Sequence, residues 1–538
     1  MRRGPQRGAL ECSNTAKETS MVLTQGLHRS LQQNPDRLAI SFRGRKRTFR
    51  EFADRVARLA SALRGIDMAE GDRVGMLSLN SDRYLEYVMG VWWGGGVLNP
   101  VNIRWSAAEI AYSLDDCDTR ILIVDDHFAD IAREVCTLAR TAPVLIHAGD
   151  GAAPPGMLSF DALIAAAAPM QDVGRGGADL ACIMYTGGTT GFPKGVMQTH
   201  LNMWSSSIMR IAESAPLPGT AVLHAAPFFH VAGLGRALVQ FIAGEAHVII
   251  PAFDAGDVLK AIGEEHVCDV LLVPTMIQAV LNHPDFATTD LTSLKRLTYG
   301  ASPIPESLLD RVLECLPGVG LSHSYGMTEA CPSISANSPS NHDEAGRRSG
   351  LYRSIGRGLP GLMVKVVDAD GKEVPRGTVG EIVVRGPNVM AGYWKKPEET
   401  ALAVRDGWLH TGDGAYMDAQ GYLYIVDRIK DMIVSGGENV YSAEVESVIV
   451  RHPAVAACAV IGIPHDVWGE AVHAVVVCKP GVTLSEDDIR GHCRLFVAAY
   501  KCPKTVEFRE QLPLSAAGKI LKRDIRAPYW AGRQRAVN

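Results

Sequence analysis

The chain has 538 residues, of which 47% are hydrophobic and 21% charged, and its net charge at pH 7 is −5. This length exceeds one domain of about 150 residues and predicts several folding units. The composition is typical of a globular protein and excludes intrinsic disorder and collagen-like repeats. The slightly acidic balance excludes a basic field that would draw the protein to nucleic acid.

The N-terminal segment Met1–Ser20 is polar and irregular, with no apolar signal core, so we expect a disordered extension ahead of a second possible start at Met21. The longest apolar stretches, near 89–101 and 163–170, fall short of the roughly 18 residues that a membrane span needs. Eleven scattered cysteines without a C-x-x-C pair are typical of reduced thiols. We therefore expect a cytoplasmic protein with no membrane span.

The first part of the chain, up to about residue 330, alternates short apolar strands with amphipathic helical stretches. The clearest strands are Arg73–Leu79, Arg120–Val124, Ala181–Tyr185, Val270–Val273 and Leu297–Tyr299. Each is followed by a polar or glycine-rich turn and then by a helical pattern. This alternation predicts an α/β fold built from doubly wound, mostly parallel sheets.

The pattern changes from about Leu362, where short strands such as Met363–Val367 and Glu381–Arg385 are separated by turn-rich segments. We expect a small β-barrel subdomain over about 350–429. A mixed pattern after Asp431 predicts a compact α+β unit. The expected division is a disordered extension at 1–20, an N-terminal domain at 21–429 and a C-terminal domain at 430–538.

The segment Tyr185–Gly195 carries the most specific functional signal in the chain. Its glycines let the backbone approach a polyphosphate closely, its threonines add hydroxyl donors, and its lysine adds a positive charge. The expected phosphate-binding residues are Thr186, Gly187, Gly188, Thr189, Thr190, Gly191 and Lys194. The spacing does not fit a Walker A loop. The loop follows a buried strand, and we expect a helix over Val196–Ile211.

This loop resembles the phosphate loop of the adenylate-forming enzymes, which include acyl- and aryl-CoA synthetases, adenylation domains of peptide synthetases and firefly luciferase. One departure is Gly187, where many members have serine. Similar blocks recur in the family's order from about residue 40 to residue 525. The resemblance implies a ligase that uses ATP to form an acyl-adenylate and then transfers the acyl group to the thiol of coenzyme A.

The block Tyr325–Glu329 would, by the same resemblance, form the adenylate site. Tyr325 would stack on adenine, Thr328 would contact the α-phosphate and Glu329 would hold Mg²⁺. The chemistry agrees, because Mg²⁺ favours one or two carboxylates together with phosphate oxygens.

Two further blocks resemble the nucleotide-binding segments of this family. Gly300, Ala301 and Ser302 match its adenine-binding turn, where small residues leave room for a flat base. Asp413 matches the aspartate that accepts hydrogen bonds from both ribose hydroxyls, and Arg428 matches the arginine that also reaches the ribose.

The resemblance implies that the C-terminal domain is mobile. Lys430 matches the family's hinge position, about which the small domain would rotate between two catalytic poses. The turn Ser435, Gly436 and Gly437 would approach the pantetheine thiol of coenzyme A. Lys519 would bridge the substrate carboxylate and the α-phosphate, where a fixed cation favours the meeting of two anions.

His230 matches the histidine that borders the carboxylate pocket, and small or apolar residues follow it. They favour a hydrophobic acid over acetate or malonate, and they leave open a medium- or long-chain fatty acid or an aromatic acid of the ferulate or cinnamate type. The expected partners are this small-molecule acid, ATP and coenzyme A, bound by a monomer or homodimer.

Three other functions are compatible with the same fold. A stand-alone adenylation enzyme that loads a carrier protein remains the main alternative. A luciferase-type oxygenase is not excluded. A non-catalytic nucleotide sensor is disfavoured by the joint presence of Lys194, Glu329, Asp413, Arg428 and Lys519.

Overall fold

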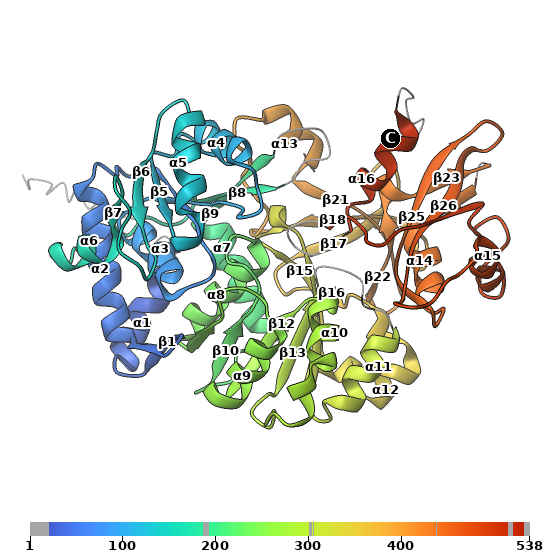
Figure 1. Cartoon of the computed structure of the whole chain (residues 1–538), viewed down its shortest axis with the longest axis horizontal. Coiled ribbons are helices and arrows are strands. Elements are labelled where there is room, and N and C mark those ends of the chain that lie inside the picture. The colour runs from blue at the N-terminus through green and yellow to red at the C-terminus, as the bar shows by residue number, and fades with distance from the viewer. Residues whose placement is uncertain are drawn as a thin grey trace, which may run out of the picture.

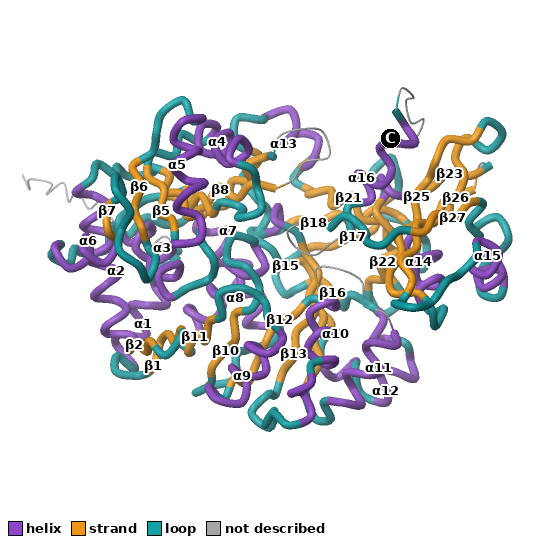
Figure 2. The backbone as a smooth tube through the Cα atoms, viewed as in Figure 1, coloured by secondary structure: helices purple, strands orange, loops and turns teal. Residues whose placement is uncertain are grey.

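The computed structural model of the chain describes residues 21–186, 193–300, 304, 306–436, 438–514 and 520–531. The expected extension Met1–Ser20 lies outside this part of the chain. So do several expected site residues, namely Gly187, Gly188, Thr189, Thr190, Gly191, Ala301, Ser302, Gly437 and Lys519. Figures 1 and 2 show a large body that holds the N-terminal elements and a smaller, C-terminal unit beside it.

The largest sheet of the described residues has the strand order β16-β15-β14-β13-β12-β10-β11-β1-β2. Its central pairs, from β1 to β14, are parallel, and its edge pairs are antiparallel. The strands are β1 (Leu38–Phe42), β2 (Arg45–Thr48), β10 (Ala221–His224), β11 (Ala246–Ile249), β12 (Val267–Leu272), β13 (Arg296–Gly300), β14 (Gly320–Gly326), β15 (Ser333–Asn337) and β16 (Arg357–Gly358).

A second sheet has the order β19-β9-β8-β4-β3-β5-β6-β7 and is parallel from β8 to β7. Its strands are β3 (Arg73–Leu77), β4 (Val97–Pro100), β5 (Ile121–Val124), β6 (Val144–His147), β7 (Leu158–Ser159), β8 (Leu180–Thr186), β9 (Lys194–Thr199) and β19 (Gly392–Tyr393). Short apolar strands that are buried on both faces explain this arrangement, because helices then cover each face.

Helices lie between and outside these two sheets. The helices of the N-terminal body are α1 (Gln25–Gln33), α2 (Phe49–Gly65), α3 (Asp82–Trp93), α4 (Ala107–Asp116), α5 (Ala129–Leu138), α6 (Phe160–Ala166), α7 (His200–Glu213), α8 (Val231–Ala243), α9 (Ala255–Glu265), α10 (Pro274–Asn282), α11 (Glu306–Cys315), α12 (Glu344–Ser349) and α13 (Pro397–Ala403). Side chains of α2, α3 and α8 share one core with strands of both sheets, and the Phe52 and Phe241 rings stack there with centroids 5.5 Å apart. Helices α9–α11 cover the outer face of the first sheet, and α4 and α5 cover the outer face of the second.

Two smaller antiparallel or mixed sheets complete the fold. The first has β17 (Met363–Val367), β18 (Gly380–Arg385), β20 (Val404–Arg405), β21 (Trp408–Met417) and β22 (Leu423–Arg428). The C-terminal sheet has β23 (Ile433–Ser435), β24 (Glu438–Val440), β25 (Val455–His465), β26 (Gly469–Cys478) and β27 (Thr505–Phe508), with helices α14 (Ser442–Val450), α15 (Glu486–Arg494) and α16 (Lys522–Arg526). The expected α/β fold class, with its small β subdomain and its small α+β C-terminal domain, is confirmed.

One expected element is wrong in part. The first four residues of the predicted helix Val196–Ile211 belong to strand β9, which pairs antiparallel with β8, and the rest, from His200, belongs to α7. The helix starts at His200 because Thr199 caps it: the Thr199 side chain accepts a hydrogen bond from the backbone of Asn202, and the Asn202 side chain accepts one in return. None of the described helices is long and apolar enough to cross a membrane.

Candidate functional site

The C-terminal ends of β13 and β14 form the centre of the site. Gly300 ends β13, and a Cβ there would lie 2.2 Å from the carbonyl oxygen of Ser324 on β14. Only glycine therefore allows the two backbones to approach this closely. Ligands of parallel sheets bind at this edge, outside the carboxyl ends of the strands.

Tyr325, near the end of β14, contacts the third sheet. Its hydroxyl donates a 2.6 Å hydrogen bond to Oδ2 of Asp413, and Nε of Arg428 lies 2.6 Å from Oδ1 of the same carboxylate. Asp413 and Arg428 are paired neighbours on β21 and β22. Burial and the charge of Asp413 raise the pKa of Tyr325, so its hydroxyl stays protonated. The carboxylate is thus fixed from both sides at the sheet edge.

Glu329 lies in a 3₁₀ turn, Thr328–Ala330, directly after β14. Its side chain is buried, and Oε1 accepts a 2.9 Å hydrogen bond from the hydroxyl of Tyr393. The ammonium of Lys194 lies 5.0 Å from the centre of the Tyr393 ring. Tyr393 therefore contacts both the expected metal ligand and the expected phosphate ligand.

Contacts from strand β9 and from the loop after β18 hold this turn in place. The Gln198 amide donates a 2.8 Å hydrogen bond to the carbonyl of Thr328, and the Asn388 amide donates one of the same length to the carbonyl of Ala330. Burial, together with the charge of Glu329, raises the pKa of Tyr393. The tyrosine hydroxyl therefore remains a hydrogen-bond donor to the carboxylate.

The expected phosphate-binding loop connects two strands of the second sheet. Thr186 ends β8 and pairs with Lys194, which begins β9. Both expected ligands at the base of the loop therefore face each other across one antiparallel pair. The loop's intervening residues, 187–192, lie outside the described part of the chain.

His230 precedes α8 and is half-buried, with its ring 4.4 Å from that of Phe229. Ala232 and Gly235 lie on the half-exposed side of this helix, whereas Leu234 is buried in the shared core. A Cβ on Gly235 would lie 2.8 Å from Cδ of Pro332, three residues after Glu329. The small side of α8 therefore packs closely against the segment that follows the adenylate motif.

Lys430 lies in a 3₁₀ turn, Ile429–Asp431, between the third sheet and the C-terminal sheet. Burial lowers the pKa of its ammonium group. On one side of this turn the Ser442 hydroxyl donates a 2.6 Å hydrogen bond to Asp427. On the other side the guanidinium of Arg526 lies 2.9 Å from Asp431. The connection is thus bounded by two polar contacts to the C-terminal domain.

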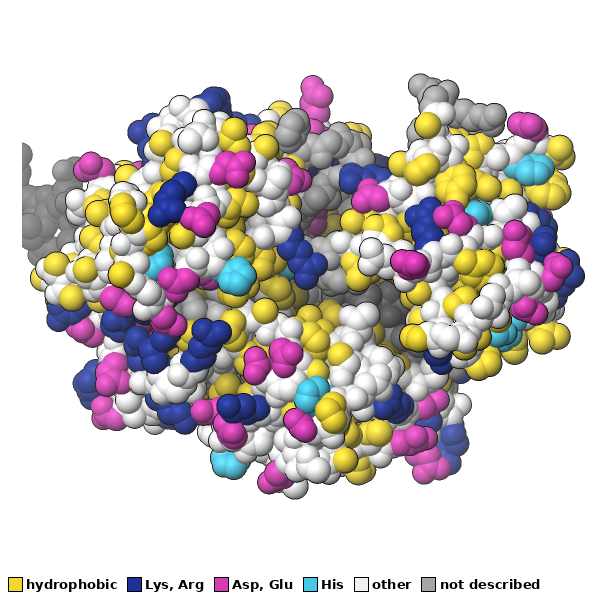
Figure 3. Space-filling view, viewed as in Figure 1, with side chains coloured by type: hydrophobic (Ala, Val, Ile, Leu, Met, Phe, Trp, Pro, Cys, Tyr) yellow, Lys and Arg dark blue, Asp and Glu magenta, His cyan; other side chains and the backbone are white. Residues whose placement is uncertain are grey.

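Ser435 and Gly436 lie in the turn of the β23–β24 hairpin. Gly436 has a φ of +62°, a left-handed conformation that favours glycine. Its N–H donates a 2.9 Å hydrogen bond to the carbonyl of Trp468. Lys519 lies outside the described residues, but its flanks pair as an antiparallel bridge between Leu514 and Ile520. The molecular face drawn in Figure 3 is hollowed between the C-terminal domain and the larger body.

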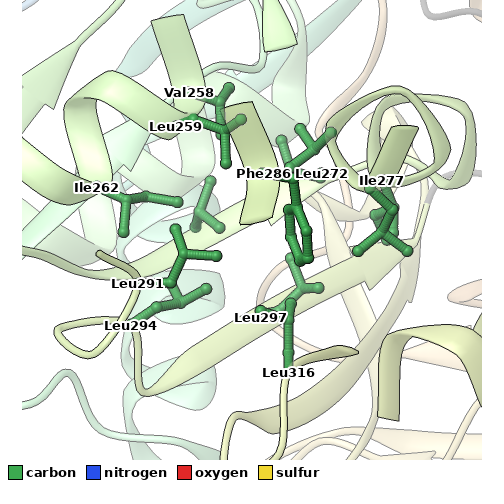
Figure 4. Close-up of a pocket in the computed structure, with 13 residues that line it drawn as sticks. Val258, Leu259, Ile262, Leu272, Ile277, Phe286, Leu291, Leu294, Leu297 and Leu316 are labelled. Atoms are coloured by element: carbon green, nitrogen blue, oxygen red, sulfur yellow. The ribbon is translucent and has the colours of Figure 1, made fainter. Parts of the chain in front are cut away.

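An apolar pocket lies elsewhere, on the outer face of the first sheet (Figure 4). Its lining comes from α9, α10, β12, β13 and nearby loops, and every lining side chain is aliphatic or phenylalanine. No lining residue belongs to the expected site. Because the same side chains form the core of that layer, we interpret the pocket as a packing gap.

Residue-based reasoning missed Tyr393, Gln198 and Asn388. Tyr393 is separated from Glu329 by 64 residues and belongs to a different sheet. The only local signal is an aromatic pair, Tyr393-Trp394, shortly before a proline that begins α13. Nothing in that signal identifies its partner.

Comparison with known proteins agrees with this geometry. The AMP-binding enzyme family matches residues 27–394, and the AMP-binding enzyme C-terminal domain matches residues 444–519. The chain therefore belongs to the AMP-binding enzyme family. It is an enzyme of the AMP-forming acid–thiol ligase class.

Individual relatives match over nearly the whole chain. A feruloyl-CoA synthase from Amycolatopsis sp is 39% identical over 93% of this chain and 98% of its own length. A fatty acid–[acyl-carrier-protein] ligase from Streptomyces coeruleorubidus is 35% identical over 96% and 98%. Among solved structures, an anthranilate CoA ligase in complex with anthranoyl-AMP has a TM-score of 0.87 and 28% identity, covering 95% of this chain and 98% of its own.

Proposed function

We propose that this enzyme joins an acid with an apolar body to coenzyme A in two steps. The acid carboxylate first attacks the α-phosphate of ATP, which releases pyrophosphate, and the thiol of coenzyme A then displaces AMP. Splitting the reaction turns a poor leaving group into a good one. The observation that carries the proposal is the joint contact of Tyr393 with Glu329 and Lys194, because it unites a metal-type carboxylate and a phosphate-type cation at one sheet edge.

The nucleotide would bind across the ends of β13, β14 and β21. Gly300 leaves space for a flat base, together with Ala301 and Ser302, and Tyr325 would stack on that base. Asp413 and Arg428 would receive the ribose. Asp413 is suited to this role because a carboxylate can accept several hydrogen bonds at once and this one is already oriented by two neighbours.

The triphosphate would bind the loop from Thr186 to Lys194, with the backbone of Gly187, Gly188 and Gly191 and the hydroxyls of Thr189 and Thr190 as donors. Thr328 would contact the α-phosphate. Glu329 fits Mg²⁺, since it is a buried carboxylate with one oxygen held by Tyr393 and capacity for further ligation. A Mg²⁺ ion bound there would act as a Lewis acid on phosphate oxygens.

The two steps would require the C-terminal domain, residues 430–538, to rotate about Lys430 relative to residues 21–429. Lys519 would enter the site during adenylation. Ser435, Gly436 and Gly437 would face the pantetheine thiol during thioester formation. The support for a hinge is local: the Lys430 turn, Ile429–Asp431, is three residues long and directly joins the third sheet to the C-terminal sheet.

The acid would lie along the half-exposed side of α8, with its carboxylate near His230. Val231, Ala232 and Gly235 give this side a small, apolar surface. An aromatic ring or a medium or long acyl chain would fill it. A short acid would forfeit roughly 0.8 kcal/mol for each buried CH₂ that it lacks.

Acid-dependent release of pyrophosphate tests this function. The panel would contain cinnamate-type acids, medium- and long-chain fatty acids, acetate and malonate, and Glu329→Gln would serve as the inactive reference. We expect release with aromatic or fatty acids and little with the two short acids. Preference for acetate over every larger acid would contradict the proposal.

The thiol acceptor distinguishes this function from the loading of a carrier protein, which the Streptomyces coeruleorubidus relative makes worth testing. The same reaction would be supplied with coenzyme A or with a phosphopantetheinylated acyl-carrier protein. We expect AMP and thioester to form with coenzyme A. Thioester formation on the carrier alone would favour the carrier-loading alternative.

A further inference from the structure

A partly buried cluster of charged residues lies in the layer between α7, α8 and the first sheet. Arg236 on α8 lies 2.5 Å from Oδ1 of Asp269 on β12, and Arg296 on β13 lies 3.6 Å from Oδ2 of the same carboxylate. Arg210, in the last turn of α7, is also buried, and its guanidinium donates a 3.3 Å hydrogen bond to Oγ of Ser322 on β14. Arg210 also senses the charges of Asp269 and Glu213, so three guanidinium groups share two carboxylates and the cluster keeps an excess of positive charge.

Several donors of this cluster lack acceptors. Within the described part of the chain, Nη1 of Arg210, Nε of Arg236 and Oγ1 of Thr298 are buried without a hydrogen-bond partner. Nη2 of Arg236 and Oδ1 of Asp269 form no regular hydrogen bond either, but they lie 2.5 Å apart as an ion pair. Protein interiors rarely leave such groups unpaired, because a buried donor without an acceptor loses its hydrogen bonds to water and gains none in the protein. Burial lowers the pKa of Arg210 to about 10, so the group is still charged at neutral pH. The unpaired donors of the cluster can therefore bind a hydrogen-bond acceptor.

The strand register relates this cluster to the adenylate site. Thr298 and Ser322 are paired neighbours on β13 and β14, and Gly300 and Ser324 are the next pair on the same face, at the sheet edge. Residues of the opposite face, such as Leu297 and Leu321, belong to the core under α9–α11. Thr298 and Ser322 consequently face α7 and α8. They lie two residues along their strands from Gly300 and Ser324, at the sheet edge where we expect the adenylate.

Helix α8 gives the same relationship from the other side. Arg236 follows His230 by six residues, which corresponds to about 9 Å along the helix. Gly235 and Arg236 both lie on its half-exposed side, and Gly235 is the residue that approaches Pro332. The charged cluster therefore lies at the far end of the surface that we assign to the acid, with apolar residues between the cluster and His230.

We propose that the acid substrate carries an oxygen acceptor at the end opposite its reacting carboxyl group, about 9 Å away by the rise of α8, and that Arg210, Arg236 and Thr298 bind this oxygen. This inference rests on the ligase function proposed above and narrows its substrate class. An aromatic acid with a hydroxyl, keto or carboxyl group at its far end fits, whereas a plain fatty acid or an unsubstituted aryl acid leaves the donors unpaired. Malonate does not fit, since its second carboxyl group is far too close to the first.

Matched pairs of acids test the inference on the unmodified enzyme. Cinnamate would be compared with 4-hydroxycinnamate and 4-carboxycinnamate, and octanoate with octanedioate, by kcat/KM for pyrophosphate release. We expect the oxygen-bearing member to be favoured by about 10- to 100-fold, the range for a hydrogen bond to a charged group. The phenol and carboxylate members distinguish a neutral acceptor from an anionic one.

The outcomes separate the two proposals. If the oxygen-free member of each pair reacts as well as its partner, the far-end acceptor is disproved, while the ligase function stands. If no acid in any pair releases pyrophosphate, the ligase function itself is contradicted, and this inference fails with it.

Variants assign the effect to particular side chains. Arg210→Met keeps the apolar stem and removes the donors, and Thr298→Val removes the hydroxyl with nearly the same shape. We expect each to reduce kcat/KM for the oxygen-bearing acid by about 10-fold more than for the oxygen-free acid. Arg348→Met, at an arginine whose side chain is 72% exposed on α12, is the matched control and should leave the ratio unchanged.

A uniform loss with both acids would indicate a structural role and overturn the assignment. If Arg210→Met does not fold, Thr298→Val and the matched acids still decide the question, because neither removes a buried charge.

Discussion

The hydroxyl of Tyr325 donates a 2.6 Å hydrogen bond to the carboxylate of Asp413, a residue 88 positions away in the sequence. The bond joins the end of β14 to β21 and thereby links the largest sheet to the small antiparallel sheet. Arg428 holds the other oxygen of the same carboxylate. Tyr325 and Arg428, both expected at the nucleoside, therefore orient the carboxylate of Asp413, which is expected there too.

Asp413→Asn should weaken ATP binding selectively. The amide presents NH₂ where a carboxylate oxygen accepted a hydrogen bond, so it can satisfy Tyr325 or Arg428 but not both together with a ribose. We expect the KM for ATP to rise by about 10-fold or more, in keeping with the loss of one charged hydrogen bond, and the KM for the acid to change less. Initial rates at varied ATP would measure this, with Asp370→Asn in an exposed turn as control. An unchanged KM for ATP would rule out a ribose contact.

Tyr393→Phe should alter the response of the enzyme to magnesium. Phenylalanine keeps the ring beside Lys194 but removes the hydroxyl that orients Glu329. Tyr393 is thus a positioning residue, and we expect the Mg²⁺ concentration for half-maximal adenylation to rise severalfold, with kcat at saturating Mg²⁺ falling by about 10-fold or less.

The matched control is Tyr424→Phe, whose hydroxyl lies 3.5 Å from the surface carboxylate of Asp418. It should leave the Mg²⁺ dependence unchanged. Equal losses of rate at every Mg²⁺ concentration in Tyr393→Phe would indicate a packing defect instead of a misoriented carboxylate.

The alternation of apolar strands and helices was sufficient to predict the doubly wound sheets, because parallel strands buried on both faces have distinctive local patterns. The start of the helix expected over Val196–Ile211 was wrong, because a tertiary contact, not the local pattern, sets the conformation of its first residues. Strand β9 is antiparallel, and the tertiary pairing of Thr186 with Lys194 decides its conformation. Apolar periodicity in a short segment cannot distinguish such a strand from the first turns of a helix.

Resemblance to the family's sequence blocks was sufficient to select Tyr325, Asp413 and Arg428, which the structure brings together. It could not identify Tyr393, since its partner lies in another sheet, nor Arg210 and Arg236. These arginines lie on helices whose local patterns are ordinary, and only the packing of α7 and α8 on β12–β14 buries the charge of Arg210 and brings Arg236 to Asp269.

Lys430→Pro should separate the two half-reactions. Proline fixes φ near roughly −65°, which is compatible with the 3₁₀ turn at this position, so the substitution should hold one pose of the C-terminal domain. We expect acyl-adenylate formation to remain largely intact and thioester formation to be lost, if the fixed pose is the adenylating one. Pyrophosphate release and thioester formation from supplied acyl-adenylate measure the two steps.

Lys430→Ala is the control for that experiment, because it removes the ammonium group and leaves the backbone free to rotate. It should affect the two half-reactions to a similar, small extent. Equal loss of both steps in a folded Lys430→Pro protein would count against a hinge at this residue.

Lys519→Ala should impair the first step alone. The lysine would act only while the carboxylate and the α-phosphate meet, so its removal should lower adenylation by on the order of 10²–10³, the size expected for one preorganised electrostatic contact. Conversion of supplied acyl-adenylate and coenzyme A to thioester should fall much less, since the proposed rotation would by then have withdrawn this residue. Both half-reactions would be measured on one purified variant.

Stability distinguishes this role from a structural one. The segment downstream of Lys519 is anchored by α16, where the Lys522 ammonium lies 2.8 Å from Glu446 and Arg526 pairs with Asp431, and Lys519→Ala leaves these contacts in place. We therefore expect the free energy of unfolding, measured by a thermal melt, to lie within about 0.5 kcal/mol of the parent's. Lys479→Ala, at an exposed lysine of the same domain, should match the parent in both half-reactions. Loss of the Lys519 charge should spare thioester formation, whereas unfolding would abolish both steps. If both half-reactions are lost while the protein stays folded, Lys519 does not act in adenylation alone.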